Sequence, residues 1–318
     1  MKEKSNIILF PQMQDTLVEK SFLAMEQENF SEALTYIDQL LHHGIENSDI
    51  AIGKIICHIQ LGQPLEAEIF CEDILERKTG KAFYTILFYY ITILFEAHRY
   101  NKIIQYIDEL ESTTTVPPEE QIKYREIYDM CQMMNEKESV ELLEKIDLKI
   151  KEKEYKNAFI FLKQWNTLHK QVPKVFYSYL LLDIHEGIKA YIWQILRERK
   201  VKDNITVSKF GESISKKPSE TTIIKQSRTY KDIAKRLEPL GQDNPVMEKF
   251  LLELTEHLLY MYVPLDFNNE VESIVETLMF IGQELYLGEK EPMHNGKVKK
   301  YIKQVMEAER LYAELFLH

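Results

Sequence analysis

Apolar residues recur every three or four positions along most of the chain, which is the spacing of helices that bury one face. Only 10 Gly and 10 Pro occur in 318 residues, so few positions force a helix to end. The pattern changes between Ile205 and Ser215, where β-branched residues surround Gly211. This segment predicts either a short β-hairpin with a glycine turn or a flexible linker. The predicted fold class is therefore all-α, with one short hairpin or linker inside it.

A short motif recurs where one predicted helix ends and the next begins. Its four copies span residues 28–34, 62–68, 98–104 and 153–159. Ala33 of the first copy is followed 34 residues later by Ala67, and Ile103 follows after a further 36. A large apolar residue stands four positions after each of these residues, so both lie on one helix face. The four pairs are Ala33 and Ile37, Ala67 and Cys71, Ile103 and Ile107, and Ala158 and Leu162.

These motifs resemble the tetratricopeptide repeat (TPR), a helical hairpin in which a small residue lies where two helices cross closely. The repeat period is about 34 residues, and the resemblance implies roughly three to five hairpins stacked into an α-solenoid. It covers approximately Asp15 to Pro173, with Ile103 departing from the family's small residue. Between the third and fourth copies, Glu119 to Lys137 has helical spacing and follows two prolines, which predicts an extra helix.

In solenoids of this kind the first helix of each repeat lines a concave face. The matching positions in this chain are almost all apolar: Val18, Phe22, Met25, Ile52, Ile56, Ile59, Phe88, Thr92 and Phe95. Relatives that clamp a terminal carboxylate place Lys, Arg and Asn there, so a clamp of that kind is not expected. Three occupants remain open: a helix or peptide of a partner, a second copy in a homodimer, and the chain's own C-terminal helices or N-terminal arm.

The C-terminal half continues with helical spacing. Pro173 begins a pattern that predicts one helix through Arg199, and Asn244 before Pro245 is a helix-start signal. The predicted divisions are an N-terminal arm (1–13), a TPR-like array (14–173), a long connecting helix (174–199), a hairpin or linker (200–218) and a C-terminal helical domain (219–318).

The overall plan also resembles a group of TPR proteins from Bacillus-type bacteria. The segments that carry this resemblance are Ile8-Leu9-Phe10-Pro11, Val207-Ser208-Lys209-Phe210-Gly211 and Asp243-Asn244-Pro245. The resemblance implies an architecture and no particular activity.

Charge is distributed unevenly along the chain. The net charge is −11, yet the segment from Arg197 to Arg236 carries 12 Lys or Arg against 5 Asp or Glu. This basic segment either contacts an acidic or polyanionic partner or packs against acidic residues of its own chain. A second basic cluster opens the last predicted helix, whose later glutamates would repel nucleic acid, so nucleic acid is not an expected partner. The candidate basic contacts are Lys209, Lys216, Lys217, Lys297, Lys299 and Lys300.

The sequence contains no Gly-rich phosphate loop, nucleophile elbow, His-Glu-x-x-His zinc helix or Cys-x-x-Cys pair. Cys57, Cys71 and Cys131 lie far apart among apolar residues, which predicts reduced thiols in the core rather than disulfides or metal ligands. We therefore expect no catalytic residues, no metal and no cofactor.

The longest apolar run, from Ala82 to Phe95, is too short to span a membrane, and the N-terminus lacks a secretory pattern, so we expect a cytoplasmic protein. The repeats and the apolar face together predict a non-enzymatic adaptor that binds a helix or peptide of a partner. One alternative is a peptide-sensing regulator with a weak nucleic-acid contact through its C-terminal basic helix. The other is a scaffold whose groove is filled by its own chain.

Overall fold

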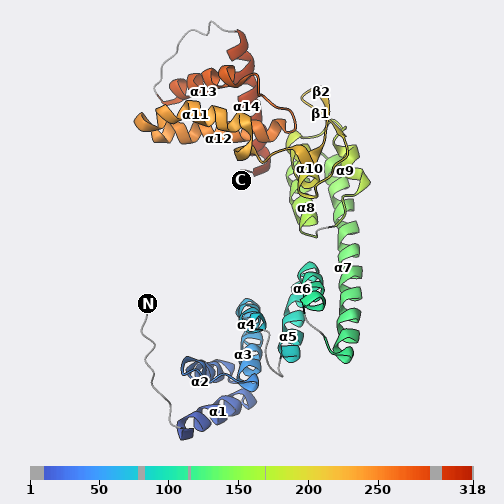
Figure 1. Cartoon of the computed structure of the whole chain (residues 1–318), viewed down its shortest axis with the longest axis vertical. Helices are drawn as coiled ribbons and strands as arrows, with labels where there is room; N and C mark the ends of the chain where they lie inside the picture. The colour runs from blue at the N-terminus through green and yellow to red at the C-terminus, as the bar shows by residue number, and fades with distance from the viewer. Residues whose placement is uncertain (1–10, 78–82, 114–115, 169, 287–295, 317–318) are drawn as a thin grey trace. The chain divides into compact units, whose positions relative to one another are not determined.

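The computed structural model describes residues 11–77, 83–113, 116–168, 170–286 and 296–316. The chain forms two compact units, Met1–Lys137 and Glu138–His318, and the boundary falls within one helix, α7 (Pro118–Lys151). Figure 1 labels the helices and strands of both units.

The first unit is a series of helical hairpins in which each helix packs against the next. Its helices before α7 are α1 (Pro11–Glu26), α2 (Phe30–His42), α3 (Ser48–Gln60), α4 (Pro64–Glu76), α5 (Phe83–Glu96) and α6 (Tyr100–Thr113). The predicted arm is corrected at one end, because residues 11–13 already belong to α1. Residues 1–10 lie outside the described part of the chain.

The turn inside each hairpin has the same backbone geometry in all four copies of the motif. Five residues before Ala33, Ala67, Ile103 and Ala158, the backbone takes a positive φ, at Glu28 (58°), Gly62 (69°), His98 (56°) and Lys153 (59°). The next amide N–H then donates back to the preceding helix, as from Gln63 to the carbonyl oxygen of His58 at 2.9 Å. This is a left-handed helix end with its backbone groups satisfied, and its recurrence fixes the same reversal of direction each time.

The crossing residues of the repeats are equivalent in burial as well as in position. Ala33, Ala67, Ile103 and Ala158 are all fully buried. The large partners Ile37, Cys71, Ile107 and Leu162 are buried beside them. The predicted helical repeat is therefore confirmed, and the bulkier Ile103 is accommodated at its crossing.

Helix α7 is longer than the sequence pattern predicted. Prolines open it at the expected place, but it continues past Lys137 because neither Gly nor Pro occurs between Glu119 and Lys151. Its first half buries Tyr124 and Cys131 in the core of the first unit. Its second half buries Ile146 and Ile150 in the core of the second unit, where they pack with α8 (Tyr155–Thr167).

The predicted connecting helix of residues 174–199 is wrong: two helices, α9 (Lys174–Tyr179) and α10 (Glu186–Glu198), occupy this span. The break arises because the His185 Nδ1 atom accepts a hydrogen bond from the Gly187 N–H at 3.0 Å and so caps α10. Leu180 and Ile184, between the two helices, are also buried. The helical spacing of apolar residues therefore continues through the break, and the sequence pattern gave no sign of it.

The predicted β-hairpin is confirmed. Strands β1 (Ile205–Lys209) and β2 (Glu212–Lys216) pair antiparallel, with Val207 opposite Ile214. Phe210 and Gly211 both have positive φ, at 49° and 80°, which is the geometry of a two-residue turn that follows the strand twist.

Four helices complete the second unit within the described residues: α11 (Arg228–Asp243), α12 (Pro245–Tyr262), α13 (Val271–Tyr286) and α14 (Gly296–Phe316). Two short 3₁₀ turns, Pro218–Glu220 and Ile224–Gln226, precede them. The Asn244 side chain accepts a hydrogen bond from the Met247 N–H at 3.0 Å, so the predicted start of α12 is confirmed. Helices α12 and α14 pack on α10, and α14 also packs on α8.

Replacing Ala67 by Leu should lower the free energy of unfolding by about 1–3 kcal/mol, because the added methylenes must enter a fully packed crossing. Ala97→Leu, at an exposed turn position, is the matched control and should change stability by less than about 0.5 kcal/mol. Urea unfolding followed by circular dichroism checks both values. Equal effects of the two substitutions would contradict the close crossing.

Gly62→Ala should destabilise the protein by about 1 kcal/mol, since only glycine adopts this positive φ without strain. An added Cβ would meet no atom within 4 Å, so the loss would report backbone strain alone. Lys153→Gly makes the opposite change, from a side chain to glycine, at the equivalent residue of the fourth copy. In thermal unfolding this variant should be as stable as the wild-type protein or more stable. Loss of stability in both variants would argue against a shared turn geometry.

Candidate functional site

The nine predicted groove residues all belong to the first unit, and we call this set the first-helix face. They lie on α1, α3 and α5, and α3 packs against both of the other helices. None of the nine is fully buried. Phe22 and Phe88 are 41% and 59% exposed, and the remaining seven are half-buried. The three helices that carry the predicted groove residues are therefore neighbours, and two of the nine side chains are well exposed within this unit.

A cavity that the sequence did not predict lies at the junction of α6 and α7. Its volume is about 690 Å³. The residues lining it are Glu111, Val116, Gln121, Ile122, Arg125, Glu126 and Asp129. Ile122, Glu126 and Asp129 each follow a member of the first-helix face (Phe88, Thr92 and Phe95) by 34 residues. Counting 34 residues onward from the first-helix face into α7 would therefore have identified these three residues.

The hairpin lysine Lys209 is not a surface contact, so that prediction is corrected. Its side chain is fully buried, and its ammonium group donates to the carbonyl oxygens of Met261 and Val263 at the end of α12. The neighbouring residues Ser208 and Phe210 gave no sign of this burial. Burial lowers the pKa of Lys209 to about 7, because the charged form loses its hydration.

A second buried lysine, which the sequence analysis did not single out, holds the hairpin from the other side. Lys189 on α10 donates to the carbonyl oxygen of Ser208 at 2.6 Å and lies 3.4 Å from the Glu186 carboxylate. The same carboxylate accepts a hydrogen bond from the Phe210 N–H at 3.1 Å. The two lysines and Glu186 therefore attach the hairpin to α10 and α12.

Several other cations of the basic segment are paired within their own unit. The Lys216 ammonium group lies 2.6 Å from the Asp266 carboxylate, and Lys217 lies 3.1 Å from Glu220. Lys225 pairs with Glu256 at 3.0 Å and Arg236 with Glu272 at 3.2 Å. These distances support the interpretation that the basic segment packs against acidic residues of its own chain.

At the start of α14, Lys297, Lys299 and Lys300 are exposed. The Lys300 ammonium group lies 5.5 Å from the centre of the Tyr301 ring. The sequence predicted that the helix's later glutamates would repel nucleic acid, and in the structure they make internal contacts.

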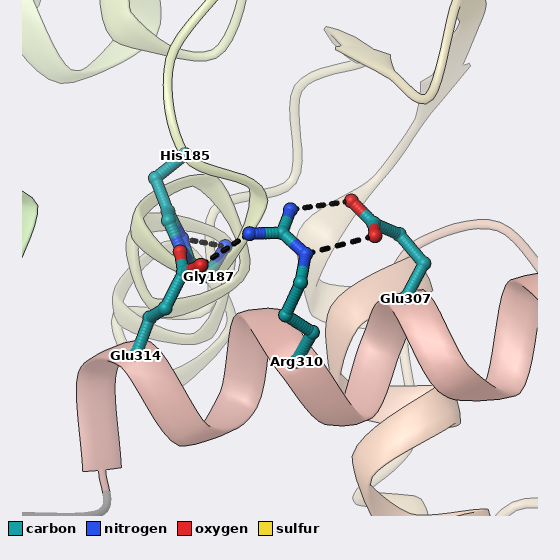
Figure 2. Close-up of polar contacts among 5 residues, drawn as sticks. All are labelled: His185, Gly187, Glu307, Arg310 and Glu314. Atoms are coloured by element: carbon teal, nitrogen blue, oxygen red, sulfur yellow. Dashed lines mark hydrogen bonds and ion pairs between the residues drawn. The ribbon is translucent and has the colours of Figure 1, made fainter.

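Figure 2 shows Glu314 of α14 facing His185, and Glu307 paired with Arg310 of the same helix. The Glu314 carboxylate lies 3.3 Å from the His185 ring and also pairs with Arg310, which bonds Glu307 at 2.7 Å. Burial lowers the pKa of His185, although the nearby Glu314 charge acts in the opposite direction. Because the Gly187 N–H donates to Nδ1, the proton of the neutral ring lies on Nε2 and faces Glu314.

The three cysteines are free and fully buried, as predicted for core thiols. Burial raises the pKa of Cys57 and Cys131 to about 11 and that of Cys71 to about 12, so all three are protonated at neutral pH and unreactive as nucleophiles. Among the described residues, no group of three or more His, Cys, Asp or Glu side chains is arranged to hold a metal ion. In the same part of the chain, no helix has the length and apolar character that a membrane span requires.

Comparison with known proteins supports the repeat. No family model and no solved structure matches the chain. The chain is 28% identical over 281 residues to the TPR repeat-containing protein YsoA of Bacillus subtilis, an alignment that covers 83% of this chain and 81% of that protein. The predicted resemblance to TPR proteins of Bacillus-type bacteria is confirmed, and the fold is an all-α TPR-like array followed by helices and a small hairpin.

Between pH 7 and 10, Lys209 should make the free energy of unfolding rise with pH. In this range the unfolded state keeps the lysine proton, with an ordinary pKa near 10.5, while the folded state releases it near 7, so unfolding takes up a proton. The contribution approaches about 1.4 kcal/mol per pH unit. Urea unfolding across this range should show a smaller rise for Lys209→Met and an unchanged one for Lys217→Met. Identical slopes in all three proteins would contradict the burial of Lys209.

Proposed function

We propose that the chain is a non-enzymatic adaptor that binds a helix or peptide of a partner protein on the first-helix face. The observation that carries this proposal is that nine mostly apolar residues lie on three neighbouring helices, α1, α3 and α5, and that Phe22 and Phe88 among them are exposed. Contiguous apolar surfaces of this kind on soluble proteins commonly mark interaction sites.

The relative with TPR repeats supports the same class of function, because stacked helical repeats are interaction modules with extended binding surfaces. The geometry suits a helical ligand. Apolar residues three or four apart on each stripe present ridges and gaps to which the apolar face of an amphipathic helix is complementary. Phe22 and Phe88 are the natural anchors, since exposed aromatic residues often supply much of the energy of an interface.

The internal pairing of the basic segment favours this proposal over a nucleic-acid function. Lys216, Lys225 and Arg236 are already paired with carboxylates of the same unit, so a phosphate backbone would have to displace those partners. Among the described residues of the first unit, no such pairing covers Phe22 or Phe88, which remain exposed.

The double variant Phe22→Asp/Phe88→Asp should lose at least about 90% of the partner that the tagged wild-type chain captures, because two charges would be buried in an apolar interface. Quantitative mass spectrometry of affinity-purified complexes measures the loss. Circular dichroism should show unchanged helix content, since both side chains are exposed in the free protein.

The matched control is Leu65→Asp/Ile69→Asp on α4. These side chains are 59% and 57% exposed but lie on a second helix, outside the first-helix face. This control should retain its partners. Equal recovery from the two double variants would locate binding elsewhere and refute the adaptor proposal for this face.

A further inference from the structure

Each stripe of the first-helix face is flanked by residues of the opposite character. Asp15 and Asp49 lie three positions before Val18 and Ile52, on the same side of their helices, because three residues are close to one helical turn. Glu26 and Glu96 directly follow the last apolar residue of α1 and α5. All four carboxylates are exposed. In the described part of the chain, none of them has an ion-pair partner.

The cations of these helices lie elsewhere. The Lys54 ammonium group on α3 lies 2.6 Å from Asp38 on α2, and Lys20 on α1 lies over the ring of Tyr36, also on α2. Both therefore turn toward the second helices. At the face itself, no Lys or Arg occupies an apolar-stripe position or one of the flanking positions described above. The surface consequently combines an apolar centre with uncompensated negative charge at its ends.

The same character continues onto α7. Glu126 and Asp129, at the positions that follow Thr92 and Phe95 by 34 residues, line the cavity beside Ile122. Arg125 is the one cation among the described residues that line this cavity, and its Nε atom lies 3.6 Å from Asp129. In the same part of the chain, Glu126 and Glu111 form no ion pair.

We propose that the occupant of the first-helix face is a cationic amphipathic helix of a partner protein, with an apolar stripe bounded by Lys or Arg. This inference rests on the proposed function and specifies its ligand. The apolar stripe of such a helix would cover Phe22, Ile56 and Phe88, while its basic residues would meet the carboxylates at the ends. Charge complementarity of this kind speeds association and excludes acidic helices of equal hydrophobicity.

The chain's own N-terminal arm has related chemistry, because Lys2 and Lys4 precede the apolar run Ile7 to Phe10. A second copy of the chain is the other competitor for the face. An experiment must therefore separate binding of a partner from occupation by this protein itself.

The test uses the full-length chain and two synthetic peptides of about 14 residues, roughly four helical turns. Both carry Leu at helical spacing, and their other positions are Lys in one peptide and Glu in the other. Fluorescence anisotropy should show the Lys peptide binding at least about tenfold more tightly, with the preference shrinking as salt rises from about 50 to 200 mM. Changing Asp15, Glu26, Asp49 and Glu96 together to Lys should reverse the preference.

The control changes Glu66, Glu76, Asp108 and Glu141 to Lys. It alters the net charge by the same amount, and its exposed residues lie on α4, α6 and α7 rather than on α1, α3 or α5. It should keep the preference for the Lys peptide. If both quadruple variants lost the preference equally, the attraction would reflect net charge alone and the proposal would fall.

The remaining outcomes distinguish this inference from the proposed function. Equal or stronger binding of the Glu peptide would overturn the cationic ligand while leaving a binding face in place. Binding of neither peptide would overturn both. Binding that appears only after deletion of residues 1–10 would show that the N-terminal arm occupies the face. A dimer that dissociates in the face variant would show that a second copy of the chain occupies it. Either result would overturn a partner helix as the occupant.

Discussion

The close crossing of paired helices at one fully buried position is the constraint on which the first unit depends. Ala33 and Ala67 occupy that position in two successive hairpins, and a left-handed residue five positions earlier sets the reversal that brings the helices together. Because both the turn and the crossing recur, the first helices α1, α3 and α5 come to lie side by side. The recurring backbone geometry thus brings these three helices next to one another.

The two units use their polar residues differently. In the second unit, Lys189 and Lys209 turn inward and satisfy backbone carbonyls, so charges that look available in the sequence are structural. In the first unit, the carboxylates near the first-helix face remain exposed beside apolar groups. Buried charge attaches the hairpin to its helices, whereas Asp15, Glu26, Asp49 and Glu96 in the first unit are exposed and form no ion pair among the described residues.

Sequence patterns predicted the features that depend on local chemistry. The turn motif, the hairpin around Gly211 and the cap at Asn244 each follow from residues close together in the chain. Other features were not predicted. The break before α10 comes from a local cap by His185 that the continuous apolar pattern does not reveal, and the burial of Lys209 depends on a distant contact, with carbonyl groups of α12 more than fifty residues later. The sequence pattern predicted that helix α7 ends at Lys137. The helix continues to Lys151 because neither Gly nor Pro interrupts it.

Photo-crosslinking in living cells tests the central claim, that the first-helix face is the contact surface for another protein, most directly. A photoreactive amino acid placed at Ile56, at the centre of the face, should yield a covalent adduct with another polypeptide after irradiation. The same amino acid at Ile69, on the second helix of that hairpin, should yield none. Adducts from Ile69 alone, or only products joined within one chain at Ile56, would contradict the account.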